Sequence, residues 1–318
     1  MMTDLPGRND LVAPGAAALP EPDQAKASGP TVWLDMDQQA LDDAYDQSKY
    51  ALNRSQIVER YASNSDIARE RLGAPRRIAY GPTANEALDL YPAASTSAPI
   101  SIFVHGGAWQ RGLAKNYAFA AELFVHAGAH HVVLDFINVI EAGGDLMPMA
   151  DQVRGAIAWV YRNAASFGGD PNRIHLYGHS SGAHLGGVAM VTDWPGLFDL
   201  PADVIKTGLL CSGMYDLRPV RLSARSRYVN FTNDMEAALS TQRHIDRFTA
   251  PVALAFGTLE TPEFQRQSRD FAAALRAAGK RVELLVGSHY NHFEIVETLA
   301  SPYGLLGHAA LVQITGAA

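Results

Sequence analysis

A serine in a glycine-flanked turn is the sharpest chemical signal in the sequence. Ser180 is the centre of GHSSG (178–182), which follows an apolar stretch with strand character and precedes a segment with helical spacing. Such a turn exposes a serine for attack, while its two glycines leave room for the neighbouring strand and helix. The helix that follows directs its positive end toward developing negative charge. The pattern predicts Ser180 as a nucleophile, and a plain glycine turn is the alternative.

A second glycine-rich segment could stabilise the oxyanion that such an attack creates. HGGAW (105–109) follows another apolar stretch, so it is expected at the carboxyl edge of a sheet. Preorganised N–H groups in a dry pocket are what a tetrahedral intermediate requires. The expected donors are the backbone N–H groups of Gly106 or Gly107 and of Ser181. His105 is expected to organise this loop rather than to act as a base.

A nucleophilic serine needs a base and an acid, which follow it in the chain order serine, acid, histidine. His292 comes directly after the last expected strand and is favoured over His289 by the Phe-Glu-Ile sequence behind it. Glu260 follows an expected strand and is the favoured acid, with Asp216 and Glu263 as alternatives. Because the base must be neutral to accept a proton, activity is expected to rise between about pH 6 and pH 8.

These residues must be positioned by strands that alternate with helices. Short apolar runs are typical of strands buried on both faces, and the helical segments between them imply a mostly parallel sheet. The first two strands are expected to form an edge hairpin. About eight strands are expected, at 78–81, 87–92, 101–107, 131–136, 173–178, 206–213, 251–257 and 281–287, with helices at 116–128, 149–166, 181–191 and 262–278.

The same patterns predict one folded domain with two additions. Residues 1–30 lack periodicity and are expected to form a flexible tail. Residues 31–318 are expected to form a single α/β domain with helices on both faces of the sheet. Within it, 31–73 is expected to be a helical N-terminal segment, and the weakly patterned 214–247 is expected to be a small lid.

Composition excludes several classes of function. A net charge of −7 and a pI near 5.9 argue against nucleic-acid and anionic-membrane partners. The single cysteine, Cys211, lies in an apolar run, which predicts a buried structural thiol in a cytoplasmic protein. No metal is expected, because the H-x-x-H at 289–292 lacks the glutamate of the zinc-protease motif. No nucleotide-binding loop occurs either, so no cofactor is expected.

Several blocks of sequence resemble the α/β-hydrolase type of kynurenine formamidase, also called arylformamidase, and related bacterial esterase-like hydrolases. The similar region runs from about Trp33 to Glu297. By this resemblance Ser180, Glu260 and His292 fall on the family's triad, and the fold is the α/β-hydrolase fold. The blocks are HGGAWQRG (105–112), DQVRGAIAWV (151–160), LYGHSSGAHL (176–185), DWP (193–195), SGMYDLRPV (212–220), PEFQRQSRDF (262–271) and HFEIVE (292–297).

The sequence departs from the family at two places. Glu260 stands where the family is expected to have aspartate, and 134–149 replaces a tyrosine-containing segment that should border the substrate. Four aromatic residues are candidates for the substrate pocket, with the core or the lid as the alternative for each. They are Trp109, Tyr117, Phe136 and Tyr290.

The resemblance implies hydrolysis of a small carboxylic amide, an N-formyl or N-acyl arylamine, through an acyl-enzyme. A carboxylesterase acting on short-chain aryl or alkyl esters is the alternative reading. A ligand-binding protein that has lost catalysis is more remote, because serine, acid and histidine are all present. The expected partner is a small-molecule substrate, and the sequence leaves a homodimer open.

Overall fold

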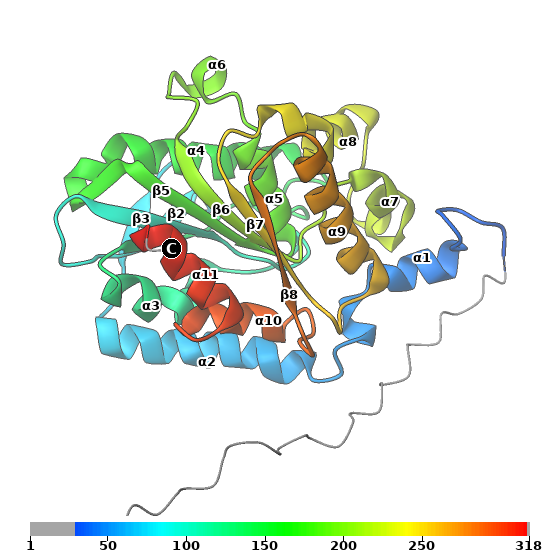
Figure 1. The fold of residues 1–318 in the computed structure, drawn as a ribbon, viewed down its shortest axis with the longest axis horizontal. Coiled ribbons are helices and arrows are strands. Elements are labelled where there is room, and N and C mark those ends of the chain that lie inside the picture. Colours follow the sequence, from blue (N-terminus) through cyan, green and yellow to red (C-terminus); the bar gives the residue numbers. More distant parts are fainter. Residues whose placement is uncertain (1–28, 317–318) are drawn as a thin grey trace, which may run out of the picture.

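The computed structural model describes residues 29–316, so nearly all of the predicted tail at 1–30 lies outside the described residues. Its centre is one eight-stranded sheet with the strand order β1-β2-β4-β3-β5-β6-β7-β8 (Figure 1). The strands are β1 (Arg76–Ala79), β2 (Ala87–Tyr91), β3 (Ala98–Val104), β4 (His130–Leu134), β5 (Gly169–His179), β6 (Ile205–Cys211), β7 (Val252–Gly257) and β8 (Val282–Gly287).

The pairing of the strands puts the ends of the parallel strands at one edge of the sheet. β1 and β2 form the predicted antiparallel hairpin, and β2 also pairs antiparallel with β4. All other neighbours, from β4 through β3 to β8, are parallel. The loops after β3, β5, β7 and β8 therefore leave the same edge, which is where α/β sheets bind ligands.

Helices cover both faces of the sheet, and each face has its own apolar cluster. In β3, Ile102 and Val104 belong to one cluster and Phe103 to the other, as the two-residue period of a strand requires. In Figure 1, α4, α5 and α9 lie over one face, and α2, α3, α10 and α11 over the other. The helices are α1 (Gln38–Ala44), α2 (Arg54–Leu72), α3 (Ala121–His126), α4 (Met147–Asn163), α5 (Ser181–Met190), α6 (Trp194–Phe198), α7 (Leu217–Leu222), α8 (Asn233–Leu239), α9 (Pro262–Ala277), α10 (Glu294–Glu297) and α11 (Leu305–Thr315).

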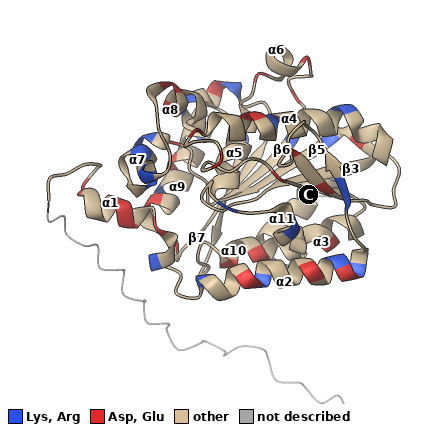
Figure 2. Cartoon of the chain, turned by 180° about the vertical axis from the view of Figure 1, so that it is seen from behind, with Lys and Arg blue, Asp and Glu red and all other residues tan. Residues whose placement is uncertain are grey.

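The N-terminal segment, 31–73, is largely helical and is dominated by one long helix. Most of it is α2, a single helix of 19 residues, preceded by α1 and the short 3-10 turn η1 (Gln47–Lys49). α2 buries Ile57, Tyr61, Ser65 and Ala68, a regular stripe in which two members are barely apolar. The helical period was hidden for that reason. Figure 2 shows acidic and basic residues intermixed along α2.

The segment predicted as a lid, 214–247, consists mainly of short helices. It contains α7 and α8 and two 3-10 segments, η5 (Ala224–Arg227) and η6 (Thr241–Arg247). Thr232 begins α8 by accepting a hydrogen bond from the amide of Met235, as a helix-capping residue does. The predicted helix at 116–128 is likewise shorter, because 3-10 turns occupy 114–116 and 118–120 ahead of α3.

Within residues 29–316 no single helix is both long enough and apolar enough to cross a bilayer. The helical segments Glu294–Ala300 and Leu305–Thr315 are together long and apolar enough, but the pair is bent by 42°.

Buried histidines should make the fold sensitive to acid. Burial lowers the pKa of His131 and His179 to about 3, and that of His175 and His184 to about 4. In unfolded chains histidine has a pKa near 6.5. Below about pH 6.5 the unfolded state therefore binds protons that the folded state does not bind. The stability that these histidines contribute is therefore complete at neutral pH and is lost as pH falls toward about 4.

We expect the free energy of unfolding to fall by up to about 1.4 kcal/mol per pH unit for each of these histidines below about pH 6.5. Urea denaturation at pH 7, 6 and 5 measures this slope. A His175→Gln variant removes one titrating group beside its hydrogen-bond partner Thr207, so its slope should be shallower. An unfolding free energy that stays constant from pH 7 to pH 5 would contradict the assignment.

Candidate active site

The turn after β5 presents Ser180 at the carboxyl edge of the sheet. β5 ends at His179, and α5 begins at Ser181, so Ser180 stands alone between strand and helix. Its backbone has φ 56° and ψ −124°, in the positive-φ region that side chains rarely adopt. The Ser180 amide donates a hydrogen bond of 2.9 Å to the carbonyl of Cys211 in β6, which fixes the turn against the sheet.

The glycines of the turn are required by close backbone contacts. A Cβ atom on Gly182 would lie 2.1 Å from the carbonyl oxygen of Val104 and 2.4 Å from that of His105. A Cβ atom on Gly178 would lie 2.7 Å from the carbonyl oxygen of Gly182. Both contacts are with backbone, which cannot rotate away, so the sequence motif has a direct steric explanation.

Replacing Gly182 by alanine should destabilise the protein by at least about 2 kcal/mol, because the turn must move away from β3. Gly155 in α4 is the matched control, since a Cβ atom there would meet nothing within 4 Å. Alanine at Gly155 should be neutral or should stabilise the helix by up to about 1 kcal/mol. Urea unfolding curves compare the two variants, and equal stability of both would contradict this explanation.

Ser180, His292 and Glu260 form a continuous chain of buried hydrogen bonds. His292 Nε2 lies 2.8 Å from Ser180 Oγ, and His292 Nδ1 lies 2.8 Å from Glu260 Oε2. A carboxylate can only accept, so Nδ1 carries the proton and Nε2 is free to accept the serine proton. All three side chains are buried.

The carboxylate of Glu260 is held in place by further donors. Its Oε1 accepts hydrogen bonds of 2.6 Å from both the Ser212 hydroxyl and the Gly257 amide. Gln47 Nε2, from η1, lies 3.5 Å from Oε2. These contacts offset the cost of burying the charge and fix the oxygen that faces His292.

The alternative acids and the alternative base are engaged elsewhere or lie outside the site. Asp216 caps α7 by accepting a hydrogen bond from the amide of Arg218. Glu263 accepts hydrogen bonds from the Tyr45 hydroxyl and from the guanidinium of Arg266. His289 is exposed, with φ 62°. Of the candidates that the sequence left open, the structure brings only Glu260 and His292 to the serine.

His179, next to the serine, supports the loop that carries His292. Its Nε2 donates a hydrogen bond of 2.8 Å to the carbonyl of His292, and the two rings lie 4.8 Å apart. Burial and the neighbouring His292 lower the pKa of His179 to about 3, so this ring stays neutral at physiological pH. His179 therefore positions the base without adding a second charge beside it.

The glycine loop after β3 lies directly against the serine. A Cβ atom on Gly106 would come within 3.0 Å of Ser180 Cβ, which shows how closely the backbone passes. Gly107, Ala108 and Trp109 have φ of 124°, 57° and 63°, so this part of the loop is strained. Within residues 29–316, the amides of Gly106, Gly107 and Ser181 donate to no other group. They remain available to a ligand.

Aromatic packing holds the loop in this conformation. His105 Nδ1 donates to the carbonyl of Gly106 at 2.8 Å, and its ring is stacked between Tyr117 and Phe136, at 5.2 and 4.6 Å. Trp109 Nε1 donates to His184 Nδ1 at 3.2 Å. The predicted role of His105 as an organiser of the loop agrees with these contacts.

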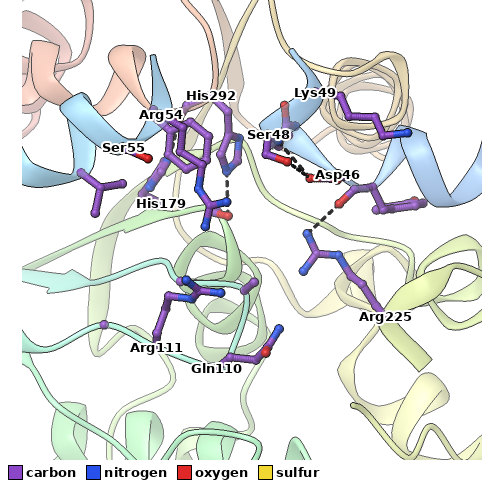
Figure 3. A pocket seen from close by; sticks show the side chains of 18 of the residues that line it. Asp46, Ser48, Lys49, Arg54, Ser55, Gln110, Arg111, His179, Arg225 and His292 are labelled. Atoms are coloured by element: carbon purple, nitrogen blue, oxygen red, sulfur yellow. Dashed lines mark hydrogen bonds between the residues drawn. The ribbon is translucent and has the colours of Figure 1, made fainter. Parts of the chain in front are cut away.

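A cavity of about 980 Å³ opens above Ser180 and His292 (Figure 3). It is enclosed by the start of α2 and η1, by the glycine loop, and by η5 of the segment 214–247. A volume of this size is typical of sites for small molecules. The chemistry that the triad and the free amides offer is therefore accessible to a substrate of moderate size.

Of the four aromatic candidates for the substrate pocket, one lies in the lining of the cavity. Tyr117 lines the cavity, but Trp109, Phe136 and Tyr290 do not. Trp109 is 1% exposed and belongs to the core, and Phe136 packs behind the loop on His105. Tyr290 is 37% exposed and lies outside the cavity lining. Aromatic type and closeness in sequence do not say on which side of a loop a ring packs, and the alternative placement in the core holds for Trp109.

The sequence analysis missed the charged lining of the cavity. Five cations line it, contributed by four separate stretches of the chain. No local motif joins these stretches, although RLSARSR (221–227) and the end of HGGAWQRG were visible as basic positions. The lining cations are Lys49, Arg54, Arg111, Arg225 and Arg227.

The chain is similar in sequence to known hydrolases. The family model BD-FAE matches residues 88–202, which include the glycine loop and the serine turn. Kynurenine formamidase from Danio rerio is 28% identical over 295 residues, covering 89% of this chain and 98% of that protein. Esterase LipC from Mycobacterium tuberculosis is 28% identical over 230 residues, covering 64% of this chain and 56% of the esterase.

The solved structures agree on the architecture. A crystal structure from Silicibacter sp. TM1040 is similar with a TM-score of 0.72 at 24% identity, covering 86% of this chain and 98% of that one. The predicted fold class is thereby confirmed, with its mostly parallel sheet of eight strands and helices on both faces. The chain is a hydrolase of the α/β-hydrolase fold, related to the kynurenine formamidases and to esterase-like hydrolases.

Proposed function

We propose that this protein is a metal-independent serine hydrolase that cleaves a small carboxylic amide or ester through an acyl-enzyme. The observation that carries the proposal is the chain of 2.8 Å contacts from Ser180 through His292 to Glu260, beneath an open cavity. Unpaired backbone amides beside the serine complete the arrangement that acyl transfer requires. Within residues 29–316 no group of three His, Cys, Asp or Glu side chains is arranged to hold a metal ion.

The geometry gives each group a role in the reaction. His292 accepts the hydroxyl proton of Ser180 as the oxygen attacks the substrate carbonyl, and Glu260 stabilises the imidazolium that forms. The amides of Gly106, Gly107 and Ser181 hold the oxyanion. When the intermediate collapses, His292 gives its proton to the leaving amine or alcohol. Water then attacks the acyl-enzyme by the same steps and releases the acid.

The substrate class that we propose is an N-formyl or N-acyl arylamine. Three observations support it: the similarity to a kynurenine formamidase over 89% of the chain, the cavity of about 980 Å³, and the ring of Tyr117 in its lining. A carboxylesterase is the second candidate, because LipC is an esterase by name and the same triad cleaves either bond. The two candidates differ in the leaving group and not in the catalytic residues.

Substrate turnover separates the two candidates. The kcat/KM values for N-formyl-L-kynurenine and for p-nitrophenyl acetate should be compared in the purified wild-type protein. Rapid hydrolysis of the formamide supports the arylformamidase proposal. Ester hydrolysis without turnover of the formamide would favour the carboxylesterase, and no hydrolysis of any amide or ester in a panel of acyl sizes would contradict both.

A further inference from the structure

The cations that line the cavity fall into two groups, according to their partners. Three of the five already have protein partners: Lys49 forms an ion pair with Asp43, and Arg227 forms one with Asp42. Arg225 donates to the Tyr228 hydroxyl at 2.8 Å and to the carbonyl of Tyr45 at 3.2 Å. The charges of Lys49 and Arg227 are therefore paired with carboxylates, whereas the guanidinium of Arg225 is held by two neutral oxygens.

Arg54 and Arg111 form the second group. Neither guanidinium has an ion pair or a hydrogen bond within residues 29–316. The guanidinium of Arg54 lies 5.6 Å from the ring centre of Phe293, the residue after His292. Figure 3 shows both side chains in the cavity on the side of His292, from different elements. Among the lining carboxylates, Glu59 also lacks a partner in the described chain, but it is exposed.

Both arginines are tied to segments that carry the catalytic groups. Asn53, which precedes Arg54, donates to Glu294 at 2.7 Å and accepts a hydrogen bond of 3.0 Å from Asn291. These contacts fix the start of α2 to the loop of His292. The Arg111 amide donates to the carbonyl of Gly107 at 3.2 Å, which closes the oxyanion loop on itself. The backbone at each arginine is therefore anchored to a segment that carries a catalytic group.

We infer that Arg54 and Arg111 bind a carboxylate on the substrate, so that the preferred substrate is an anionic amide or ester. Guanidinium groups form strong, paired hydrogen bonds with carboxylates, and two free ones beside a nucleophile favour an anionic ligand. The inference rests on the proposed function. Because the acyl group there is small, the carboxylate belongs to the leaving group.

Matched substrates that differ in charge test the inference. The esters 3- and 4-acetoxybenzoate should be compared with their neutral carboxamides, in wild-type protein and in Arg54→Gln and Arg111→Gln. The readout is the ratio of kcat/KM for the anionic ester to that for the neutral ester. We expect each substitution to lower this ratio roughly 10-fold, mainly through KM, because one charge-assisted contact is lost. The Arg54→Lys and Arg111→Lys variants should retain part of the preference for the anionic ester.

Arg60→Gln is the control for general loss of positive charge. Arg60 is on the same helix as Arg54, is paired with Glu297 and does not line the cavity, so the ratio should not change. If both arginine variants have the same ratio as the wild-type protein, the inference is wrong. The proposed function still stands in that case, provided that the protein hydrolyses the esters. If the wild-type protein hydrolysed no ester or amide, the proposed function would fail and the inference with it.

Discussion

Replacing Ser180 by alanine is expected to lower kcat/KM by roughly 10⁵- to 10⁶-fold, the largest loss from any single substitution in this protein. The hydroxyl of Ser180 is the atom that His292 Nε2 contacts at 2.8 Å, beside the oxyanion loop. Cys211 is buried in β6, and burial raises the pKa of its thiol, so it cannot substitute. The measurement is hydrolysis of the best substrate found for the wild-type protein.

The matched control is Ser166→Ala, which removes an exposed hydroxyl bonded to the carbonyl of Asn163. This variant should retain wild-type kcat/KM. The Ser180→Ala protein should unfold at the wild-type temperature or above it, since alanine loses one hydroxyl and keeps the turn. Turnover by Ser180→Ala within 10-fold of wild type would show that another group attacks the substrate.

Replacing Glu260 by glutamine is expected to lower kcat/KM by roughly 10³- to 10⁴-fold. Glutamine has nearly the same shape, but it carries no charge to stabilise the imidazolium of His292. Its amide can also donate to Nδ1, which would move the ring proton to Nε2, where it blocks acceptance of the serine proton. The pH dependence of kcat/KM should be recorded for the variant and the wild-type protein. A substitution that only reduced the fraction of folded protein would leave the shape of this pH profile unaltered.

Asp216→Asn is the comparison that the alternative acid requires. Asp216 caps α7, so its loss should cost about 1 kcal/mol or less of stability and little activity. A large loss of activity in Asp216→Asn, together with near-wild-type turnover in Glu260→Gln, would reverse the assignment of the acid. Comparable modest losses in both would show that neither carboxylate orients His292.

The backbone of the site could be predicted from the sequence because local constraints determine it. A Cβ atom on Gly178 or Gly182 would lie less than 3 Å from backbone atoms, so only glycine fits at these positions. Such a local steric requirement can be recognised in the sequence as a motif. Glu260 and His292 follow strands whose ends must meet at one edge of a parallel sheet, so their closeness follows from topology. Their pairing could be expected before any distance was known.

The cavity could not be predicted in the same way. Its walls come from α2, η5 and the glycine loop, and their mutual placement depends on tertiary contacts such as that between Asn53 and Glu294. The period of α2 was obscured by Ser65 and Ala68, which are buried but carry little apolar signal. Trp109 was misplaced because its positive φ turns it toward His184 and the core. Arg54 and Arg111 had no motif to connect them.

Covalent labelling by a fluorophosphonate tests most directly whether Ser180 is an activated nucleophile. The wild-type protein should gain one adduct by intact mass, peptide mapping should place it on Ser180, and hydrolysis should stop in proportion to labelling. The Ser180→Ala protein should remain unlabelled under the same conditions. A wild-type protein that stays unmodified, or that is labelled at another residue while Ser180 is intact, would contradict the account.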